Sequence, residues 1–437
     1  MAKYQQYKEY KDSGVEWLGE IPRDWKITRI KHSATLNMGQ SPNSEDCNMD
    51  GNGYPFLQGN AEFGTMSPTA KQYCPIPRKL ANEGDLLFSV RAPVGALNVA
   101  DKVYGIGRGL CSLTSNSQMT QSFLWWVLPS YKYQLDAIST GSTFEAVSAE
   151  QVSNLLFALP TYGEQAQIAN FLNHETAQID TLIDKQQTLI QLLKEKRQAV
   201  ISYAVTKGLN PDAPMKDSDV EWLGEVPEHW KVTKLGQLAF MQEGPGLRHW
   251  QFKDQGTRVI CVTNITEDGI DFTRLEKFIS NSEYSQGYQR FTVQANDILL
   301  SSSGNSWGKV ASYRGQEKVI LNTSTIRLNE LGDRPLIQDF LKYFLTSENC
   351  REQLGIAMTG SCQPNFGPSH LKEVKTPVPP IDEQLEISAY ISNQLYRFNQ
   401  QLDACEKAIQ LMQERRTALI SAAVTGKIDV RGWVAPN

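Results

Sequence analysis

A glycine-rich segment that ends in a lysine is the clearest candidate in this chain for a phosphate-binding loop. Gly304, Gly308 and Lys309 resemble a loop that cradles phosphate groups. Such a loop needs four residues between its glycines and Ser or Thr after the lysine. Here three residues separate the glycines and Val310 follows the lysine. The glycine-rich segment 105–109 is likewise too short for a dinucleotide fingerprint. Both segments therefore indicate turns.

Metal and redox chemistry find no better support. The seven cysteines contain no CxxC pair, which favours a reduced, cytoplasmic setting without a zinc site. The first ten residues, MAKYQQYKEY, are polar and do not resemble a signal peptide. No stretch approaches the ~18 consecutive apolar residues of a membrane span. The histidines show no metal-ligand spacing: His32, His174, His229, His249 and His370.

The elements that would position a site are duplicated. Residues 11–30 (KDSGVEWLGEIPRDWKITRI) and 216–235 (KDSDVEWLGEVPEHWKVTKL) are identical at 13 of 20 positions. Such identity establishes an internal repeat, which frames the rest of the chain. We interpret its tryptophans, Trp17 and Trp25 with Trp222 and Trp230, as packing anchors rather than a ligand cage.

Two long helices form a second repeat. Each is expected to start after prolines at a Glu-Gln pair, Glu164-Gln165 or Glu383-Gln384, and to stop before glycine, Gly208 or Gly426. Apolar residues recur every seven positions, which is typical of a coiled coil. One series holds Leu172, Ile179, Leu193 and Val200, and the other Ile168, Leu182 and Leu189; the second helix repeats the first series at Ile391, Phe398, Cys405, Met412 and Leu419. Two separate surface helices remain the alternative.

Two diverged blocks lie between the repeats. Their short apolar runs, separated by Gly, Pro, Asn and Ser, predict mainly-β blocks with a few helices, most clearly at 121–137 and 336–354. The segments we expect are 1–30 (N-terminal repeat segment), 31–159 (first block), 160–210 (first long helix), 211–235 (second repeat segment), 236–380 (second block) and 381–437 (second long helix and tail).

The order of these parts predicts an architecture of the α+β class. If the helices pair antiparallel, two mainly-β blocks are separated by a long two-helix coiled coil and related by a pseudo-two-fold axis. The N-terminal repeat would then lie beside the end of the second helix. Its copy would lie in the same way beside the end of the first.

The VEWLGE-(I/V)-P-x-x-W repeat, the Glu-Gln helix start and the R-x-A-x-I-S-x-A-V-T helix end resemble the specificity subunit of type I restriction-modification systems. The resemblance covers essentially the whole chain. It implies two target-recognition domains that read the halves of a bipartite, asymmetric DNA sequence, with helices that set the gap between them. It also implies two methyltransferase subunits and possibly two restriction subunits as partners. This chain would bind no cofactor, S-adenosylmethionine belonging to the methyltransferase, and ATP and Mg²⁺ to the restriction subunit.

The residues independently favour a non-catalytic chain. No (D/N/S)-P-P-(Y/F/W) stretch is present to grip a flipped adenine, because Val378-Pro379-Pro380-Ile381 fails the pattern. No glycine-rich strand-turn signature for a methyl donor occurs either. We therefore assign no catalytic residue.

Bases in the major groove are read by Arg, Asn, Gln, Ser and Thr on exposed loops beside a rigid sheet. On that basis the expected readers in the first block are Gln58, Asn60, Arg91, Arg108, Ser142 and Thr143. In the second block they are Thr263, Asn264, Ser302, Asn305, Trp307, Asn322, Ser361, Gln363 and Asn365. Each could instead be an ordinary turn residue that satisfies its own backbone.

Charge sets a limit on DNA binding. The chain carries a formal net charge of −5, whereas a protein that grips DNA alone needs a basic excess to neutralise phosphates. We therefore expect weak binding by the isolated chain, with partner subunits supplying much of the grip. A free-standing DNA-binding regulator with duplicated heads and a non-catalytic protein adaptor are the alternative functions.

Overall fold

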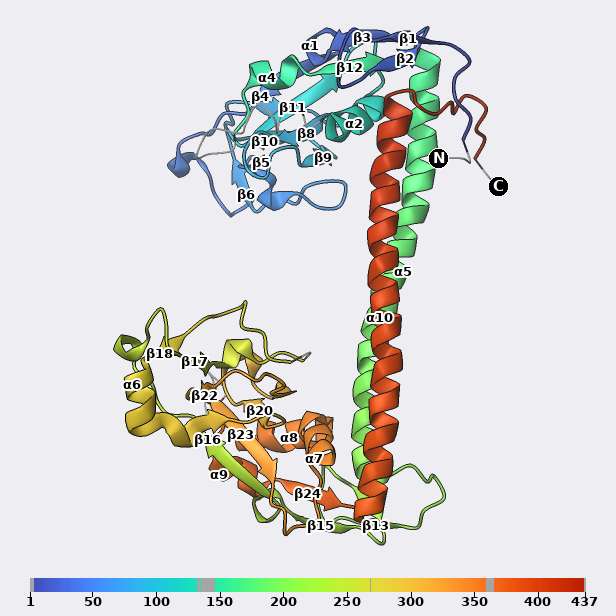
Figure 1. Ribbon diagram of the computed structural model, residues 1–437. Helices are drawn as coiled ribbons and strands as arrows, with labels where there is room; N and C mark the ends of the chain where they lie inside the picture. The colour runs from blue at the N-terminus through green and yellow to red at the C-terminus, as the bar shows by residue number, and fades with distance from the viewer. Residues whose placement is uncertain (1–3, 132–133, 135–145, 268, 359–364, 436–437) are drawn as a thin grey trace. The chain divides into compact units, whose positions relative to one another are not determined.

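The computed structural model describes residues 4–131, 134, 146–267, 269–358 and 365–435 (Figure 1). The chain divides into two compact units. Unit 1 comprises Met1–Gln186 with Lys407–Asn437, and unit 2 comprises Gln187–Glu406. The helices α5 (Tyr162–Lys207) and α10 (Ile381–Val424) each contribute one part to either unit. None of the helices in the described part of the chain combines the length and apolarity that crossing a bilayer requires.

Unit 1 is built around two four-stranded sheets. The first is antiparallel, in the order β4 (Ala34–Met38), β11 (Leu110–Ser115), β8 (Leu86–Ser89), β9 (Leu97–Val99). The second is mixed, in the order β6 (Gln72–Cys74), β5 (Tyr54–Leu57), β10 (Tyr104–Ile106), β7 (Leu80–Ala81). Its central strands β5 and β10 run parallel, so their carboxyl ends meet at one edge.

Unit 2 repeats this topology strand for strand. Its antiparallel sheet has the order β16 (Ala239–Glu243), β23 (Thr325–Glu330), β20 (Ile298–Ser301), β21 (Val310–Ser312). Its mixed sheet has the order β18 (Phe278–Ile279), β17 (Thr257–Ile260), β22 (Val319–Leu321), β19 (Thr292–Val293), with β17 and β22 parallel. The duplication expected from the repeats therefore extends through the diverged blocks.

The strand β8 shows why short apolar runs form the centre of each unit. All four of its residues are buried, and successive side chains of a strand point to opposite faces. Leu86 and Phe88 join the core shared with the helices, whereas Leu87 joins the core between the sheets. The equivalent strand β20 divides Ile298, Leu300 and Leu299 in the same way.

Short helices cover the antiparallel sheets. In unit 1 these are α1 (Ile30–Ser33), α2 (Gln121–Ser130) and α4 (Ala149–Ser153). In unit 2 they are α7 (Gln338–Thr346), α8 (Glu348–Ala357) and α9 (Pro368–Glu373), while α6 (Asn281–Glu283) lies in the loop before β19. The helix predicted at 336–354 is thus two helices, because the Ser347 side chain accepts the Cys350 N–H and starts α8 anew.

The short sequence repeats form two-stranded sheets at equivalent places in the two units. We call each place, where a short repeat packs against the start of a long helix, a joint. In unit 1, β1 (Tyr10–Asp12) pairs with β2 (Glu20–Pro22), and β3 (Lys26–Arg29) pairs with β12 (Leu156–Leu159). In unit 2, β13 (Met215–Asp217) pairs with β14 (Glu225–Pro227), and β15 (Lys231–Lys234) with β24 (Lys375–Val378). Trp25 and Trp230 are fully buried in these joints, as packing anchors should be, whereas Trp17 is 42% exposed.

The duplicated Glu-Gln pair holds each joint together. Glu164 accepts the indole N–H of Trp25 at 3.5 Å, and Glu383 accepts that of Trp230 at 2.9 Å. The neighbouring Gln165 accepts the backbone N–H of Thr120 at 2.8 Å, where α2 begins. These bonds explain why two adjacent polar residues recur at the start of both long helices.

Within each unit the parts of α5 and α10 lie antiparallel. In unit 1, Asp180 accepts two hydrogen bonds from Arg416, at 2.8 and 3.2 Å, while the earlier residue Gln167 reaches the later carbonyl of Arg431. In unit 2 the end of α5 at Gly208 lies beside Glu383 at the start of α10. The expected fold class, α+β with mainly-β blocks and paired long helices, is confirmed.

The heptad assignment of α5 requires one correction. The series Leu172 to Val200 lies buried or half-buried, but Leu182 and Leu189 are 49% and 41% exposed. Ile183 and Ile190, one position further along, face inward instead. Leu182 and Ile183 lie three and four residues after the core residue Ile179, and both positions border the same apolar stripe. The apolar pattern alone therefore did not decide which of the two faces inward.

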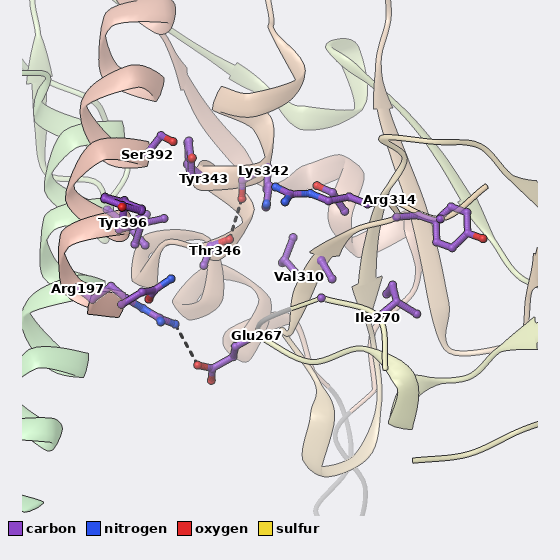
Figure 2. A pocket seen from close by; sticks show the side chains of 18 of the residues that line it. Arg197, Glu267, Ile270, Val310, Arg314, Lys342, Tyr343, Thr346, Ser392 and Tyr396 are labelled. Carbon is purple, nitrogen blue, oxygen red and sulfur yellow. Dashed lines mark hydrogen bonds and ion pairs between the residues drawn. The ribbon is translucent and has the colours of Figure 1, made fainter. Parts of the chain in front are cut away.

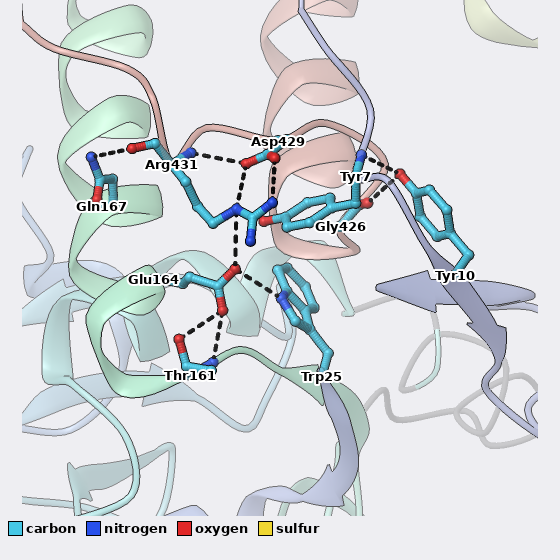
Figure 3. Close-up of polar contacts among 9 residues, drawn as sticks. All are labelled: Tyr7, Tyr10, Trp25, Thr161, Glu164, Gln167, Gly426, Asp429 and Arg431. Carbon is cyan, nitrogen blue, oxygen red and sulfur yellow. Dashed lines mark hydrogen bonds and ion pairs between the residues drawn. The ribbon is translucent and has the colours of Figure 1, made fainter. Parts of the chain in front are cut away.

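The N-terminal repeat and the segment after α10 meet in unit 1, as expected (Figure 3). The Lys427 ammonium donates to the carbonyls of Leu18 and Glu20 in the N-terminal repeat. Lys207, after the first helix, donates in the same way to Leu223 and Glu225. Figure 3 shows Arg431 from the tail between Asp429 and Glu164, with its guanidinium over the Tyr7 ring.

Candidate nucleic-acid interface

The carboxyl ends of the parallel strands β5 and β10 gather the expected readers of unit 1. Gln58 directly follows β5, and only Gly107 separates Arg108 from the end of β10. The Gln58 amide donates to the Ser41 hydroxyl at 2.9 Å, and the Arg108 backbone N–H donates to the same oxygen at 3.3 Å. Both Gln58 and Arg108 are exposed, so their polar groups face solvent rather than the core.

Arg91 belongs to the same edge. The Val90 N–H donates to the Gly109 carbonyl at 3.0 Å. Arg91 and Arg108 are the chain neighbours of these two hydrogen-bonded residues, so they lie close together. Arg91 is exposed, and its carbonyl accepts the Ser89 hydroxyl at 2.7 Å. A guanidinium in such a position can fork onto the two acceptors of guanine.

The remaining candidates of unit 1 contribute less. Asn60 lies half-buried in a single 3₁₀ turn (Asn60–Glu62), where its carbonyl accepts the Phe63 N–H. Ser142 and Thr143 lie outside the described residues. Ser41 was missed from the sequence, although Gly39 just before it is a signal. A Cβ at Gly39 would lie 2.2 Å from the Gly107 carbonyl oxygen, so the segment carrying Ser41 must press against β10.

Unit 2 builds the equivalent edge from different residues. The Asn322 N–H donates to the Ile260 carbonyl at 3.0 Å, as the Gly107 N–H does to Leu57 in unit 1. Cys261 therefore stands at the position of Gln58. Burial raises the pKa of its thiol, an effect that the Asn322 amide partly opposes.

The structure also sets Ser303 and Thr323 at the positions of Arg91 and Arg108. The Ser302 N–H donates to the Ser324 carbonyl at 2.9 Å, matching the bond from Val90 to Gly109. The bridge between Ser303 and Asn365 likewise matches the one between Arg91 and Ala146. Ser303 and Thr323 were not predicted from the sequence, because two loops that meet across the sheets carry no common local signal.

Two candidates of unit 2 are corrected. Asn264 is fully buried: its amide oxygen accepts the Cys261 N–H at 2.9 Å, and its nitrogen donates to the carbonyls of Asp271 and Leu275. These bonds hold the loop after β17 and leave nothing for a base. Ser302 is also fully buried, and no partner is present for its hydroxyl in the described structure.

The other candidates of unit 2 differ in access. Thr263, Asn305 and Asn365 are exposed, and Asn305 lies in a 3₁₀ turn (Gly304–Ser306). Trp307 is half-buried, with the Arg351 guanidinium 4.6 Å from its ring centroid. Ser361 and Gln363 lie outside the described residues. For the exposed residues, base contact stays a prediction.

The described residues contain no cluster of three or more His, Cys, Asp or Glu side chains that could hold a metal ion. What the two edges offer is hydrogen bonding from rigid strand ends. Unit 1 presents two arginines and an amide, and unit 2 presents hydroxyls and amides. The same scaffold therefore carries two different sets of donors and acceptors.

Comparison with known proteins agrees with this arrangement. Residues 22–192 and 227–407 each match the family described as the type I restriction modification DNA specificity domain. The putative type I restriction enzyme MjaX specificity subunit of Methanocaldococcus jannaschii is 36% identical over 197 residues, 44% of this chain and 45% of that protein. The MjaVIII specificity subunit of the same organism is 23% identical over 97% of both chains. The EcoBI specificity subunit of Escherichia coli is 24% identical over 98% of this chain and 91% of its own.

Solved structures share the fold. One, from work on complex assembly and conformational transition of the type I R-M system, aligns over 92% of this chain and 98% of its own, with a TM-score of 0.72 and 14% identity. The HsdS subunit from Thermoanaerobacter tengcongensis aligns over 93% and 98%, with a TM-score of 0.52 and 16% identity. Because the family matches both diverged blocks together with part of each long helix, this chain belongs to the type I restriction-modification DNA specificity family.

Proposed function

We propose that this chain is the DNA sequence-recognition subunit of a type I restriction-modification complex. Each mainly-β domain reads one half of a bipartite, asymmetric DNA sequence. The chain itself is not an enzyme. It binds duplex DNA and directs partner subunits that carry out the chemistry.

The observation that carries this proposal is the contrast between constant joints and variable strand ends. Both units use the same tryptophan, glutamate and glutamine to fix the short repeat to a long helix. At the edge where the parallel strands end, however, Gln58 and Arg108 are replaced by Cys261 and Thr323. A protein that reads two different half-sites needs the same scaffold in both domains and different residues at the strand ends, because base contacts specify the sequence.

The charges at these edges predict different preferences. Arg pairs with guanine through two hydrogen bonds, whereas Ser and Thr form single bonds with several bases. We therefore infer that the edge of unit 1, with Arg91 and Arg108, favours guanine at one position or more. Unit 2, with Ser303, Thr323 and Asn365, reads its half-site through hydroxyl and amide groups.

The partners follow from the family. We propose two methyltransferase subunits, with two restriction subunits in a complex that also cuts DNA, assembled on this chain in the cytoplasm, where duplex DNA is present. S-adenosylmethionine is bound by the methyltransferase partner, and ATP and Mg²⁺ by the restriction partner. No cofactor is assigned to this chain, whose described residues supply structural hydrogen bonds and the donors at the two edges.

Exchanging residues 236–380 for the same block of a relative tests the proposal. Mapping of methyladenine in DNA from cells with the original or the exchanged chain should show that one half-site changes while the other stays. The matched control exchanges residues 31–159 and should change the other half-site. An adaptor whose blocks bind only protein would leave the methylated sequence as it was in both experiments. A free-standing regulator would leave methylation unaffected when the chain is removed.

A further inference from the structure

A cavity of about 760 Å³ in unit 2 lies between the antiparallel sheet and the long helices (Figure 2). Its walls come from β21, α7, the loop after β17 and one face each of α5 and α10. All its lining residues belong to unit 2. The cavity is separate from the strand ends that gather the candidate readers.

The charges that line this cavity are mostly positive. Arg197 forms an ion pair with Glu267 at 3.1 Å, which leaves Arg314 and Lys342 as the lining cations without an ion pair among the described residues. Among the residues that the structure describes, no carboxylate forms an ion pair with either of them. Figure 2 shows the two side chains directed toward each other.

Keeping two cations together has an electrostatic cost. Burial of the Lys342 ammonium lowers its pKa, and the nearby Arg314 lowers it further, while Asp339 opposes the shift. An anion between the two groups would remove this repulsion. The cavity is therefore set up to receive negative charge.

Unit 1 supplies an internal comparison. The Tyr313 N–H donates to the Asp297 carbonyl as the Ala100 N–H does to Asp85, so Arg314 corresponds to Asp101. Gln338 and Gln121 both donate to the turn before the equivalent strands β20 and β8. Four residues after these glutamines, Lys342 corresponds to Trp125. The same scaffold is thus complete without the two cations, and their presence is specific to unit 2.

We propose that this cavity binds one phosphate group of the DNA backbone. The inference rests on the proposed function and adds a contact that carries no sequence information. The loop after β17 supports DNA as the source of the phosphate, because it carries the exposed candidate reader Thr263 and then lines the cavity with Glu267, Gly269, Ile270 and Phe272. Since Asp101 and Trp125 replace the cations in unit 1, the contact lies on the side of one half-site alone.

The test uses the full chain assembled with its methyltransferase partner and duplex DNA that carries its methylated sequence. Single neutral methylphosphonates are placed at each backbone position in turn. With the original chain, one position should weaken binding by about tenfold, because one charge contact is lost. The variant Arg314→Gln, Lys342→Gln should weaken binding to ordinary DNA to a similar extent and be insensitive to that methylphosphonate. It should also reduce the slope of log affinity against log salt by about 1.

A matched variant, Lys231→Gln with Lys372→Gln, removes two exposed lysines of the same unit and should leave the sensitive position unchanged. The inference is overturned if the cavity variant keeps its sensitivity at that position. A loss of affinity for the methyltransferase in place of DNA would also overturn it and point to an acidic protein segment. Failure of the proposed function is a different result, in which the original chain directs methylation to no particular sequence.

Discussion

Gln384 offers the sharpest test of how each domain is fixed to its helix. It is fully buried at the start of α10, and its amide oxygen accepts the Ile337 N–H at 3.0 Å. Its nitrogen donates to the carbonyls of Pro335 and Pro379, at 2.8 and 2.9 Å. Ile337 precedes α7 and has no side-chain cap of its own, so a residue from another helix satisfies the start of α7.

Replacing Gln384 with alanine removes three hydrogen bonds and leaves the half-buried Ile337 N–H and the carbonyls of Pro335 and Pro379 without this partner. At about 1 kcal/mol for each bond and up to about 2 kcal/mol for the orphaned donor, we expect a loss of ~3 to 5 kcal/mol. Gln384→Glu should cost at least as much, because a carboxylate accepts from Ile337 but repels both carbonyl oxygens. The equivalent Gln165→Ala should destabilise unit 1 to a similar degree, since that side chain makes the same set of bonds.

Hydrogen exchange followed by mass spectrometry measures these losses for each unit separately. In Gln384→Ala, peptides that cover α7 should exchange their amide hydrogens faster, while peptides that cover α2 should exchange at the original rate. Gln401→Ala provides the control, because Gln401 is exposed on the same helix and its loss should cost less than ~0.5 kcal/mol. A loss under 1 kcal/mol at Gln384, or equal losses at Gln384 and Gln401, would refute the reasoning.

Three further outcomes are expected. Arg108→Ala should lower the discrimination between bases at one position of the half-site read by unit 1 by ~1 to 3 kcal/mol. Methyladenine maps should then show more than one base at that position and an unchanged second half-site. One heptad inserted into both α5 and α10 adds ~10.5 Å of helix, so the unread gap should lengthen by about three base pairs; an unchanged gap would exclude the helices as its determinant. The hydrogen bond from Arg431 lowers the pKa of Asp429. Its stabilisation is therefore present at neutral pH and is lost as pH falls below the ordinary value of about 3.9, a dependence that Asp429→Asn should remove from acid unfolding curves.

The architecture could be predicted because the short repeat and the long helix each occur twice in the sequence. Shared residues such as Trp25 with Trp230 and Glu164 with Glu383 lie at the joints between a short repeat and a long helix. Proline and glycine marked where those helices begin and end, since both act through local backbone geometry. The place of the N-terminal repeat beside Gly426 followed from antiparallel pairing without any knowledge of the sheets.

The reading edges were harder to predict, because long-range pairing decides which strand-end residues are exposed. Gln58 and Asn264 both follow a buried strand, but the first reaches Ser41 at the surface and the second ties down its own loop. A local pattern cannot separate these cases, because an asparagine in a turn satisfies the backbone as readily as it meets solvent. The position of Ser303 depended on a bridge to Asn365, 62 residues away in sequence.

The charge of the chain bears on how it holds DNA. Residues 236–380 contain fifteen basic and fifteen acidic residues. The structure engages several of these arginines internally: Arg258 pairs with Glu276 and Glu317, and Arg327 pairs with Asp297.

Cations held in this way contribute little to phosphate neutralisation, which supplies most of the affinity for nonspecific DNA. We therefore expect the isolated chain to bind duplex DNA weakly at physiological salt and the assembly with methyltransferase subunits to bind it tightly. Titration of labelled duplex with each, at several salt concentrations, decides the matter. If the chain alone bound as tightly as the assembly and with the same salt dependence, the partners would not be needed for the grip. The cations for which the described residues provide no ion pair, Arg91, Arg108, Arg314 and Lys342 among them, would then have to account for the entire salt dependence.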